Sequence, residues 1–133
     1  MGAGLAGITF AETAIQNGRN VIVITDKSQN SSVVAGGLYN PVILKRFTEV
    51  WQSQSQLNLL TEFYANLEQK LNNKLDYKIP LLRKFYSIEE QNNWFTASDK
   101  PGLTNYLSTN LIASNYKSID APFGYGEVLQ TGY

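Results

Sequence analysis

The sequence predicts an α/β fold from three features that follow one another at its start. Residues 2–7 are a glycine-rich turn, Gly-Ala-Gly-Leu-Ala-Gly. Residues 5–17 carry apolar side chains at helical spacing, and Gly18 is a typical helix stop. Residues 20–25 (Asn-Val-Ile-Val-Ile-Thr) form a dense β-branched run, which is typical of a strand buried on both faces of a parallel sheet. A turn, a helix and a buried strand in this order make the second half of a βαβ unit.

The glycine turn has the G-x-G-x-x-G spacing of a dinucleotide-binding turn. In such a turn Gly2 would make the bend, Gly4 would let the backbone approach a pyrophosphate, and Gly7 would let the helix pack closely on the sheet. The free N–H groups and positive dipole end of the helix favour the pyrophosphate. The alternative is a plain tight turn that leads into a helix. A dinucleotide turn follows a strand and only Met1 precedes this one, so we expect that first strand to be missing.

An acidic residue at the end of the second strand usually holds the ribose hydroxyls. The spacing puts Thr25 at that position, and Asp26 follows one residue later. A threonine hydroxyl binds a ribose more weakly than a carboxylate does. The sequence does not decide between Thr25 and Asp26, and Asp26 can equally be an ordinary loop residue.

The middle of the chain predicts a loop and then a long helix. Residues 26–41 are rich in Ser, Asn and Gly, and a helix is expected from about Thr48 to Asn72. Its apolar residues recur at steps of three and four and form one stripe, which indicates core packing or, less simply, a partner-binding helix; they are Leu57, Leu60, Tyr64, Leu67 and Leu71.

The rest of the chain predicts short strands around one helix. Residues 76–86 alternate around Pro80 and suggest one or two strands. Ser87 and Glu90 form a capping-box pattern for a helix to about Ala97, in which Trp94 and Phe95 are expected to anchor a core. Residues 111–118 and 127–131 are the remaining candidate strands.

Composition excludes several kinds of chemistry. The 11 basic and 11 acidic residues give zero net charge, which provides no electrostatic case for nucleic acid or an anionic membrane. No apolar run reaches the roughly 18–20 residues of a membrane span, and no signal peptide is recognisable, so we expect a cytoplasmic protein. Cysteine and histidine are absent, which rules out disulfides, thiolate metal sites and a serine–histidine triad within this chain. Any chemistry must come from carboxylates, Lys, Tyr, Arg or a bound cofactor.

The loop after residues 20–25 bears on the kind of nucleotide. Residues 31–41 read Ser-Ser-Val-Val-Ala-Gly-Gly-Leu-Tyr-Asn-Pro. Glycines allow close backbone approach, and serines supply hydroxyl and amide donors to a phosphate or a planar ring. Together with the glycine turn, the helix and residues 21–24, this loop resembles the N-terminal segment of the FAD-dependent D-amino acid oxidase/glycine oxidase superfamily. The resemblance is specific over about the first 45 residues and rests on element order beyond them.

The resemblance implies a Rossmann-like FAD-binding portion, taken as residues 1–75, and the incomplete beginning of a mixed α+β substrate domain, residues 76–133. It implies non-covalent FAD, with Gly2, Gly4 and Gly7 at the pyrophosphate and Thr25 or Asp26 near the ribose. Ser31 and Ser32 would touch the diphosphate, and Ala35, Gly36 and Gly37 would approach the flavin. The run Gly37-Leu38-Tyr39-Asn40-Pro41 also looks like the oxidase domain of bifunctional tRNA-uridine-modifying enzymes.

The family implies oxidation of a C–N bond in an amino acid or amine by hydride transfer to the flavin. Because the chain is short for such an enzyme, we expect it to be inactive by itself. Substrate carboxylates are typically held by Arg and Tyr, but no motif singles out a catalytic residue. The candidates are Arg46, Arg83, Tyr39, Tyr86 and Tyr125. An NAD-dependent dehydrogenase domain and a non-catalytic nucleotide-binding or interaction module are the alternatives.

Overall fold

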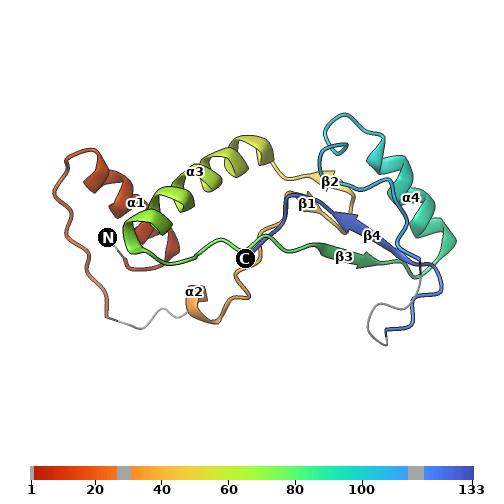
Figure 1. Ribbon diagram of the computed structural model, residues 1–133, viewed down its shortest axis with the longest axis horizontal. Coiled ribbons are helices and arrows are strands. Elements are labelled where there is room, and N and C mark those ends of the chain that lie inside the picture. The colour runs from red at the N-terminus through yellow and green to blue at the C-terminus, as the bar shows by residue number, and fades with distance from the viewer. Residues whose placement is uncertain (1, 27–30, 114–118) are drawn as a thin grey trace. The chain divides into compact units, whose positions relative to one another are not determined.

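The computed structural model of the chain describes residues 2–26, 31–113 and 119–133. Helices and short antiparallel strands are combined, and the chain divides into two compact units, Met1–Gly37 and Leu38–Tyr133 (Figure 1). The mixed α and β character agrees with the expected class, whereas the described residues form no Rossmann sheet. The boundary expected at residue 75 lies inside the second unit, which also contains the long helix.

The N-terminal unit consists of two helices and extended chain. α1 spans Leu5–Gln16, as the apolar spacing predicts, and Gly18 ends it with φ 69° while its N–H donates to the Ile15 carbonyl at 2.9 Å. The left-handed φ explains why glycine is favoured at this helix end. α2 is a single turn, Ser31–Val34, inside the predicted loop. Ala11 is the buried residue of α1, so this helix has little core beneath it.

The predicted strand over residues 20–25 is wrong. These residues have no regular secondary structure, and the side chains of Ile22 and Ile24 are 80% and 72% exposed. A strand exists only when its N–H and C=O groups pair with a neighbour. Along the described chain no backbone hydrogen bond reaches Val21–Ile24, which explains why strong β-propensity alone does not produce a strand here.

The second unit contains two antiparallel strand pairs. β1 (Val42–Ile43) pairs with β2 (Thr48–Glu49), and β3 (Leu81–Lys84) pairs with β4 (Tyr125–Val128) in a register that matches Leu81 with Val128. β3 begins directly after Pro80, which has no N–H to contribute to a ladder. β4 starts two residues before the expected strand at 127–131.

The far edge of β4 is also occupied. Single bridges join Val128 to Leu107 and Tyr125 to Ile112. Ile112 is therefore the part of the predicted 111–118 strand that pairs, and residues 114–118 lie outside the described residues. Pairing on both edges makes β4 the central strand of the second unit.

The long helix α3 spans Ser53–Leu71 rather than 48–72. It starts later because Thr48 and Glu49 pair with β1. Leu57 packs against the core, whereas Leu71 at the end of the predicted stripe is exposed. The stripe is half-buried from Leu57 to Leu67 and exposed at Leu71.

The capping box predicted at Ser87 is confirmed. α4 spans Ile88–Ser98, and the Ser87 hydroxyl accepts the Glu90 N–H at 3.1 Å. In return the Glu90 carboxylate accepts the Tyr86 N–H at 2.9 Å. These two bonds satisfy backbone donors at the start of the helix, as the sequence pattern requires.

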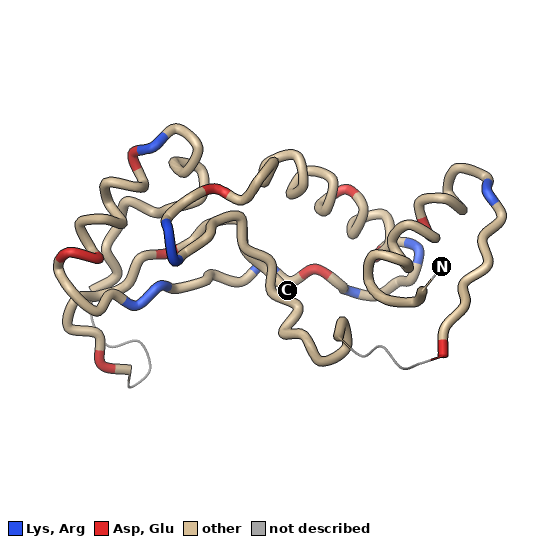
Figure 2. Tube along the Cα trace, turned by 180° about the vertical axis from the view of Figure 1, so that it is seen from behind, with Lys and Arg blue, Asp and Glu red and all other residues tan. Residues whose placement is uncertain are grey.

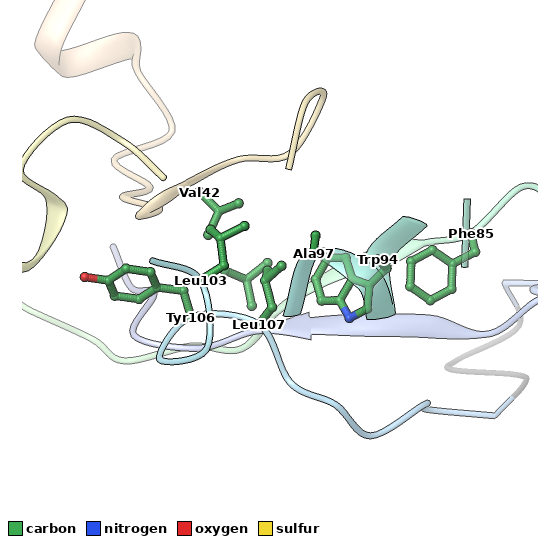
Figure 3. Packing of buried hydrophobic residues seen from close by; sticks show 8 residues of the cluster. Val42, Phe85, Trp94, Ala97, Leu103, Tyr106 and Leu107 are labelled. Carbon is green, nitrogen blue, oxygen red and sulfur yellow. The ribbon is translucent and has the colours of Figure 1, made fainter. Parts of the chain in front are cut away.

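α4 carries the centre of the core. The Trp94 side chain is completely buried, and the ring of Phe85 packs edge-on against it with its centroid 5.5 Å away (Figure 3). The ring of Phe47 also packs edge-on against Trp94, at 5.7 Å. Its indole N–H donates to the Ser108 carbonyl at 3.0 Å, so the one polar atom of the ring is satisfied. A Cβ on Gly126 of β4 would collide with the indole, so glycine there lets the strand approach the ring. The expectation that Trp94 and Phe95 anchor a core is confirmed: Phe95 packs against the same cluster, half-buried.

Candidate cofactor-binding site

The glycine turn lies at the N-terminus of α1. Gly4 is the N-cap with φ −72° and ψ 172°, and its carbonyl accepts the Ile8 N–H at 2.9 Å as the first bond of the helix. Gly2 and Gly4 precede the helix, and Gly7 lies half-buried in its first turn. The first turn contains no acidic residue. The amides at this end therefore retain their attraction for an anion.

The loop serine Ser32 contacts this helix end. Its hydroxyl oxygen accepts the Leu5 N–H at 3.2 Å, across 27 residues of sequence. Ser31 begins α2, and its carbonyl accepts the Ala35 N–H at 3.0 Å. The two stretches on which the family resemblance rests, the glycine turn and the serine loop, thus meet within the N-terminal unit.

The space around the turn is open on the side of its first two glycines. A Cβ on Gly2 would meet nothing within 4 Å, and one on Gly4 would meet only the Ser32 hydroxyl, at 3.9 Å. A hydroxyl has one donor and two acceptor positions. Ser32 can therefore accept the Leu5 amide and still donate its proton to an anion oxygen placed above Gly4.

Thr25 and Asp26 are exposed and follow the irregular segment rather than a strand. No sheet edge fixes their position, so the geometry does not choose between them as ribose ligands. Ala35, Gly36 and Gly37 are exposed too, and a Cβ on either glycine would meet nothing within 4 Å. Gly37 has φ 68°, a conformation that favours glycine. The last part of the serine loop is therefore accessible to a ligand.

Three of the five candidates for binding a substrate carboxylate are occupied by internal bonds. The guanidinium of Arg83 contacts Glu90, with Nε 3.1 Å from Oε1. The Tyr125 hydroxyl donates to the Ile119 carbonyl at 3.1 Å, and the Tyr39 hydroxyl donates to Asp76 at 2.9 Å. Arg83 and Tyr125 therefore have structural roles in the second unit. The other two candidates, Arg46 and Tyr86, are exposed.

Tyr39, Asp76 and Lys78 form a cluster of charged and phenolic groups. The sequence pointed to Tyr39 as a candidate but did not predict its two partners. The Lys78 ammonium lies 2.8 Å from the Asp76 carboxylate, donates to the Tyr39 hydroxyl and sits over the Tyr39 ring at 5.0 Å. A Cβ on Gly132 would clash with the Tyr39 hydroxyl, so this glycine leaves room for the ring. No sequence spacing links residues 39, 76 and 132; bridges from Gly132 to Tyr39 and to Lys78 bring them together.

Burial and hydrogen bonding act against each other in this cluster. Burial raises the pKa of Tyr39, as does its bond to Asp76, whereas the Lys78 contact acts in the opposite direction. Burial lowers the pKa of Lys78, but its bonds to Asp76 and Tyr39 outweigh this and raise it overall. Both groups are held protonated, so Tyr39 is not prepared to act as a base.

A cleft of about 530 Å³ lies beside this cluster within the second unit. α3 contributes Leu57 and Thr61, and the facing wall is formed by residues 78–80 and 127–131. The volume is in the range of small-molecule sites. Lys78 supplies a positive charge to the lining of the cleft, and its ion pair with Asp76 compensates this charge.

The described residues offer neither a membrane-spanning helix nor a cluster of metal ligands. None of their helices combines the length and apolar character that a membrane crossing requires. None of their His, Cys, Asp and Glu side chains gather into a group of three that could hold a metal ion. No known protein-family model matches the chain, and no solved structure matches it.

Proposed function

We propose that the chain is the N-terminal part of an FAD-dependent oxidoreductase that oxidises a C–N bond of an amino acid or amine. One observation supports this most: the Ser32 hydroxyl accepts the first amide of α1 and so joins the two motif stretches that the family uses for FAD. A plain tight turn would not need a serine from 27 residues away.

The residues around this contact fit a pyrophosphate. Gly2 and Gly4 leave open space, the start of α1 supplies N–H donors, and no acidic side chain in its first turn repels an anion. Ser32 would donate to a phosphate oxygen, with Ser31 beside it. In this proposal FAD is held non-covalently, and the chain has no cysteine or histidine through which it could be attached.

Bound flavin would supply the hydride acceptor, and the protein would bind and orient it. Gly7 would let α1 pack against the sheet of the complete fold, and Thr25 or Asp26 would lie near the ribose. Ala35, Gly36 and Gly37 would approach the flavin ring through their exposed backbone.

The proposal is tested by titrating the chain into FAD and following flavin fluorescence. In the variant Gly4→Ala the new methyl group meets only Ser32 in the free protein, so the fold is preserved. It would occupy the space that a pyrophosphate needs. We expect FAD affinity to fall at least about tenfold, which corresponds to roughly 1.4 kcal/mol.

The matched control is Ser55→Ala, an exposed serine on α3, which should leave FAD affinity unchanged. Equal affinity of Gly4→Ala and wild type would contradict the proposed site. Binding of NADH in preference to FAD would favour the dehydrogenase alternative, and binding of neither nucleotide would favour the interaction module.

A further inference from the structure

Asn17 and Gly18 at the end of α1 form an asparagine–glycine pair, which occurs once in the sequence. In such a pair the backbone nitrogen of the glycine can attack the side-chain carbonyl carbon of the asparagine and close a five-membered imide ring. Glycine favours this step because it has no side chain to block the approach and leaves the backbone free to adopt unusual angles. Asparagine is among the thermally labile residues. The pair is therefore a candidate for chemical modification.

The structure leaves this pair accessible to water. Both residues are exposed, and a Cβ built on Gly18 would meet nothing within 4 Å. Ala11, the buried residue of α1, lies more than one helical turn before Asn17. The end of the helix is therefore open to the solvent that an imide ring needs for its hydrolysis.

Two hydrogen bonds of the last helical turn hold the reacting groups. The Asn17 side-chain amide donates to the Thr13 carbonyl at 2.8 Å, and the Gly18 N–H donates to the Ile15 carbonyl at 2.9 Å. The Gly18 nitrogen must leave its acceptor, and the Asn17 side chain must turn toward it, before the ring can close. A helix end without a core beneath it opens at a free-energy cost close to zero. The two bonds therefore slow the reaction but do not prevent it.

A positive charge close to the pair favours the ring closure. Arg19 is the one charged residue of the sequence between Glu12 and Asp26, and Figure 2 shows the basic colour in the chain just after α1. The attacking nitrogen loses its proton, so negative charge develops as the ring forms. A nearby guanidinium stabilises such a charge.

We propose that Asn17 is a deamidation site, at which the side chain is converted without an enzyme to a mixture of aspartate and isoaspartate. The Gly18 nitrogen forms a bond to the Asn17 side-chain carbonyl carbon, and the side-chain amide leaves as ammonia. Water then adds to one of the two imide carbonyls and breaks the bond between that carbon and the ring nitrogen. Attack on one carbonyl gives aspartate, and attack on the other gives isoaspartate. No group is oxidised or reduced.

The conversion weakens the end of α1 in two ways. Loss of the amide removes the donor to the Thr13 carbonyl. The new carboxylate places a negative charge at the negative end of the helix dipole, which is unfavourable. Both changes concern the last turn of α1, whereas the proposed FAD contacts lie at its first turn, so this proposal does not depend on FAD.

The test is incubation of the full chain at mildly alkaline pH, followed by trypsin cleavage and peptide mass spectrometry. Asn20 is an internal control, since it is exposed in the same stretch but precedes Val21, whose β-branched side chain hinders the attack. Cleavage after Arg19 separates the two sites. We expect conversion at Asn17 to be at least about tenfold faster than at Asn20, which corresponds to roughly 1.4 kcal/mol of activation free energy.

A parallel incubation in urea measures the rate for the unfolded chain. Because the last turn of α1 opens easily, conversion of Asn17 in the folded chain should be within about tenfold of that rate. Asn17→Asp reproduces one product, and the amides at the end of α1 should then exchange about two- to fivefold faster. The matched variant Asn20→Asp places the same charge beyond the helix and should leave their exchange unchanged.

Three results would overturn the proposal. The first is conversion of Asn17 in urea but not in the folded chain, which would mean that the helix end protects it. The second is an equal rate at Asn17 and Asn20, which would mean that Gly18 gives no advantage. The third is unchanged exchange in Asn17→Asp, which would contradict the effect on α1. The FAD titration is made on freshly purified protein, so the two proposals fail separately.

Discussion

The two compact units of this chain use their apolar residues in opposite ways. In Leu38–Tyr133 the side chains of Trp94 and Phe85 are fully buried in a shared cluster. In Met1–Gly37 the aliphatic residues of the segment Asn20–Thr25 are exposed, and α1 buries only Ala11. Burial of apolar surface is the main stabilising term in folding. The comparison teaches that the second unit is built around a buried core, whereas the first has little buried apolar surface and is joined across its sequence by the Leu5–Ser32 hydrogen bond.

Hydrogen exchange should give the largest contrast between the units. The amides of Val21–Ile24 should exchange at nearly the rate of an unfolded chain, because among the described residues they find no backbone hydrogen-bond acceptor. The amides of Phe85 and Tyr125, bonded to Gly124 and Ile112, should open only with the unfolding of the second unit, at a cost on the order of 5 kcal/mol or more. Mass spectrometry of the exchanged peptides measures both. Similar protection in the two segments would remove the distinction between the units.

Truncation of one aromatic side chain in each unit gives the next largest effect. Trp94→Ala removes the centre of the core and should lower the free energy of unfolding by about 3–5 kcal/mol. Phe10→Ala, at a side chain of α1 that is 62% exposed, should change it by less than about 0.5 kcal/mol. Urea denaturation followed by circular dichroism measures both values. A large effect of Phe10→Ala would mean that the first unit has a core of its own.

A smaller effect concerns acid stability within the second unit. The backbone N–H groups of Asp76 and Leu75 both donate to the Glu68 carboxylate at 2.8 Å, and with Lys74 they lower its pKa to about 2. A lowered folded-state pKa stabilises the fold above the ordinary value of 4.5, and this contribution is lost as the pH falls toward 2. Wild type should therefore exceed Glu68→Gln in melting temperature at pH 7, and the difference should shrink below pH 4.5.

The control for this measurement is Glu62→Gln, an exposed glutamate on the same helix. It should show no such change of the difference with pH. A difference between wild type and Glu68→Gln that stays constant from pH 7 to pH 2 would contradict the role given to the carboxylate.

Local sequence signals predicted much of the helical structure. α1 begins and ends where the glycine turn and Gly18 indicate, and α4 begins at the capping box of Ser87 and Glu90. These features depend on residues within four positions of one another, so the sequence contains all the partners they need. The burial of Trp94 was also predictable, because a large aromatic residue on an amphipathic helix is stabilised by a core.

Pairing between distant segments was not predictable in the same way. The run Val21–Ile24 has a stronger β-propensity than Leu81–Lys84 or Tyr125–Val128. Only the latter two form strands, because they pair with each other although they are far apart in the sequence. The same holds for the candidate site. The spacing of the glycine turn could be recognised in the sequence. The Leu5–Ser32 contact and the Tyr39–Asp76–Lys78 cluster depend on tertiary contacts between distant residues.

The sequence by itself determined α1, the cap of α4, the core positions of Trp94 and Phe95 and the glycine turn, because these follow from spacing and local hydrogen bonds. Only the tertiary structure decided which β-prone segment becomes a strand, since a strand needs a partner that its own sequence does not specify. It also decided which glycines are sterically required. Gly126 makes room for the Trp94 ring and Gly132 makes room for the Tyr39 ring. In both pairs the two residues are far apart in the sequence, so no local pattern connects them.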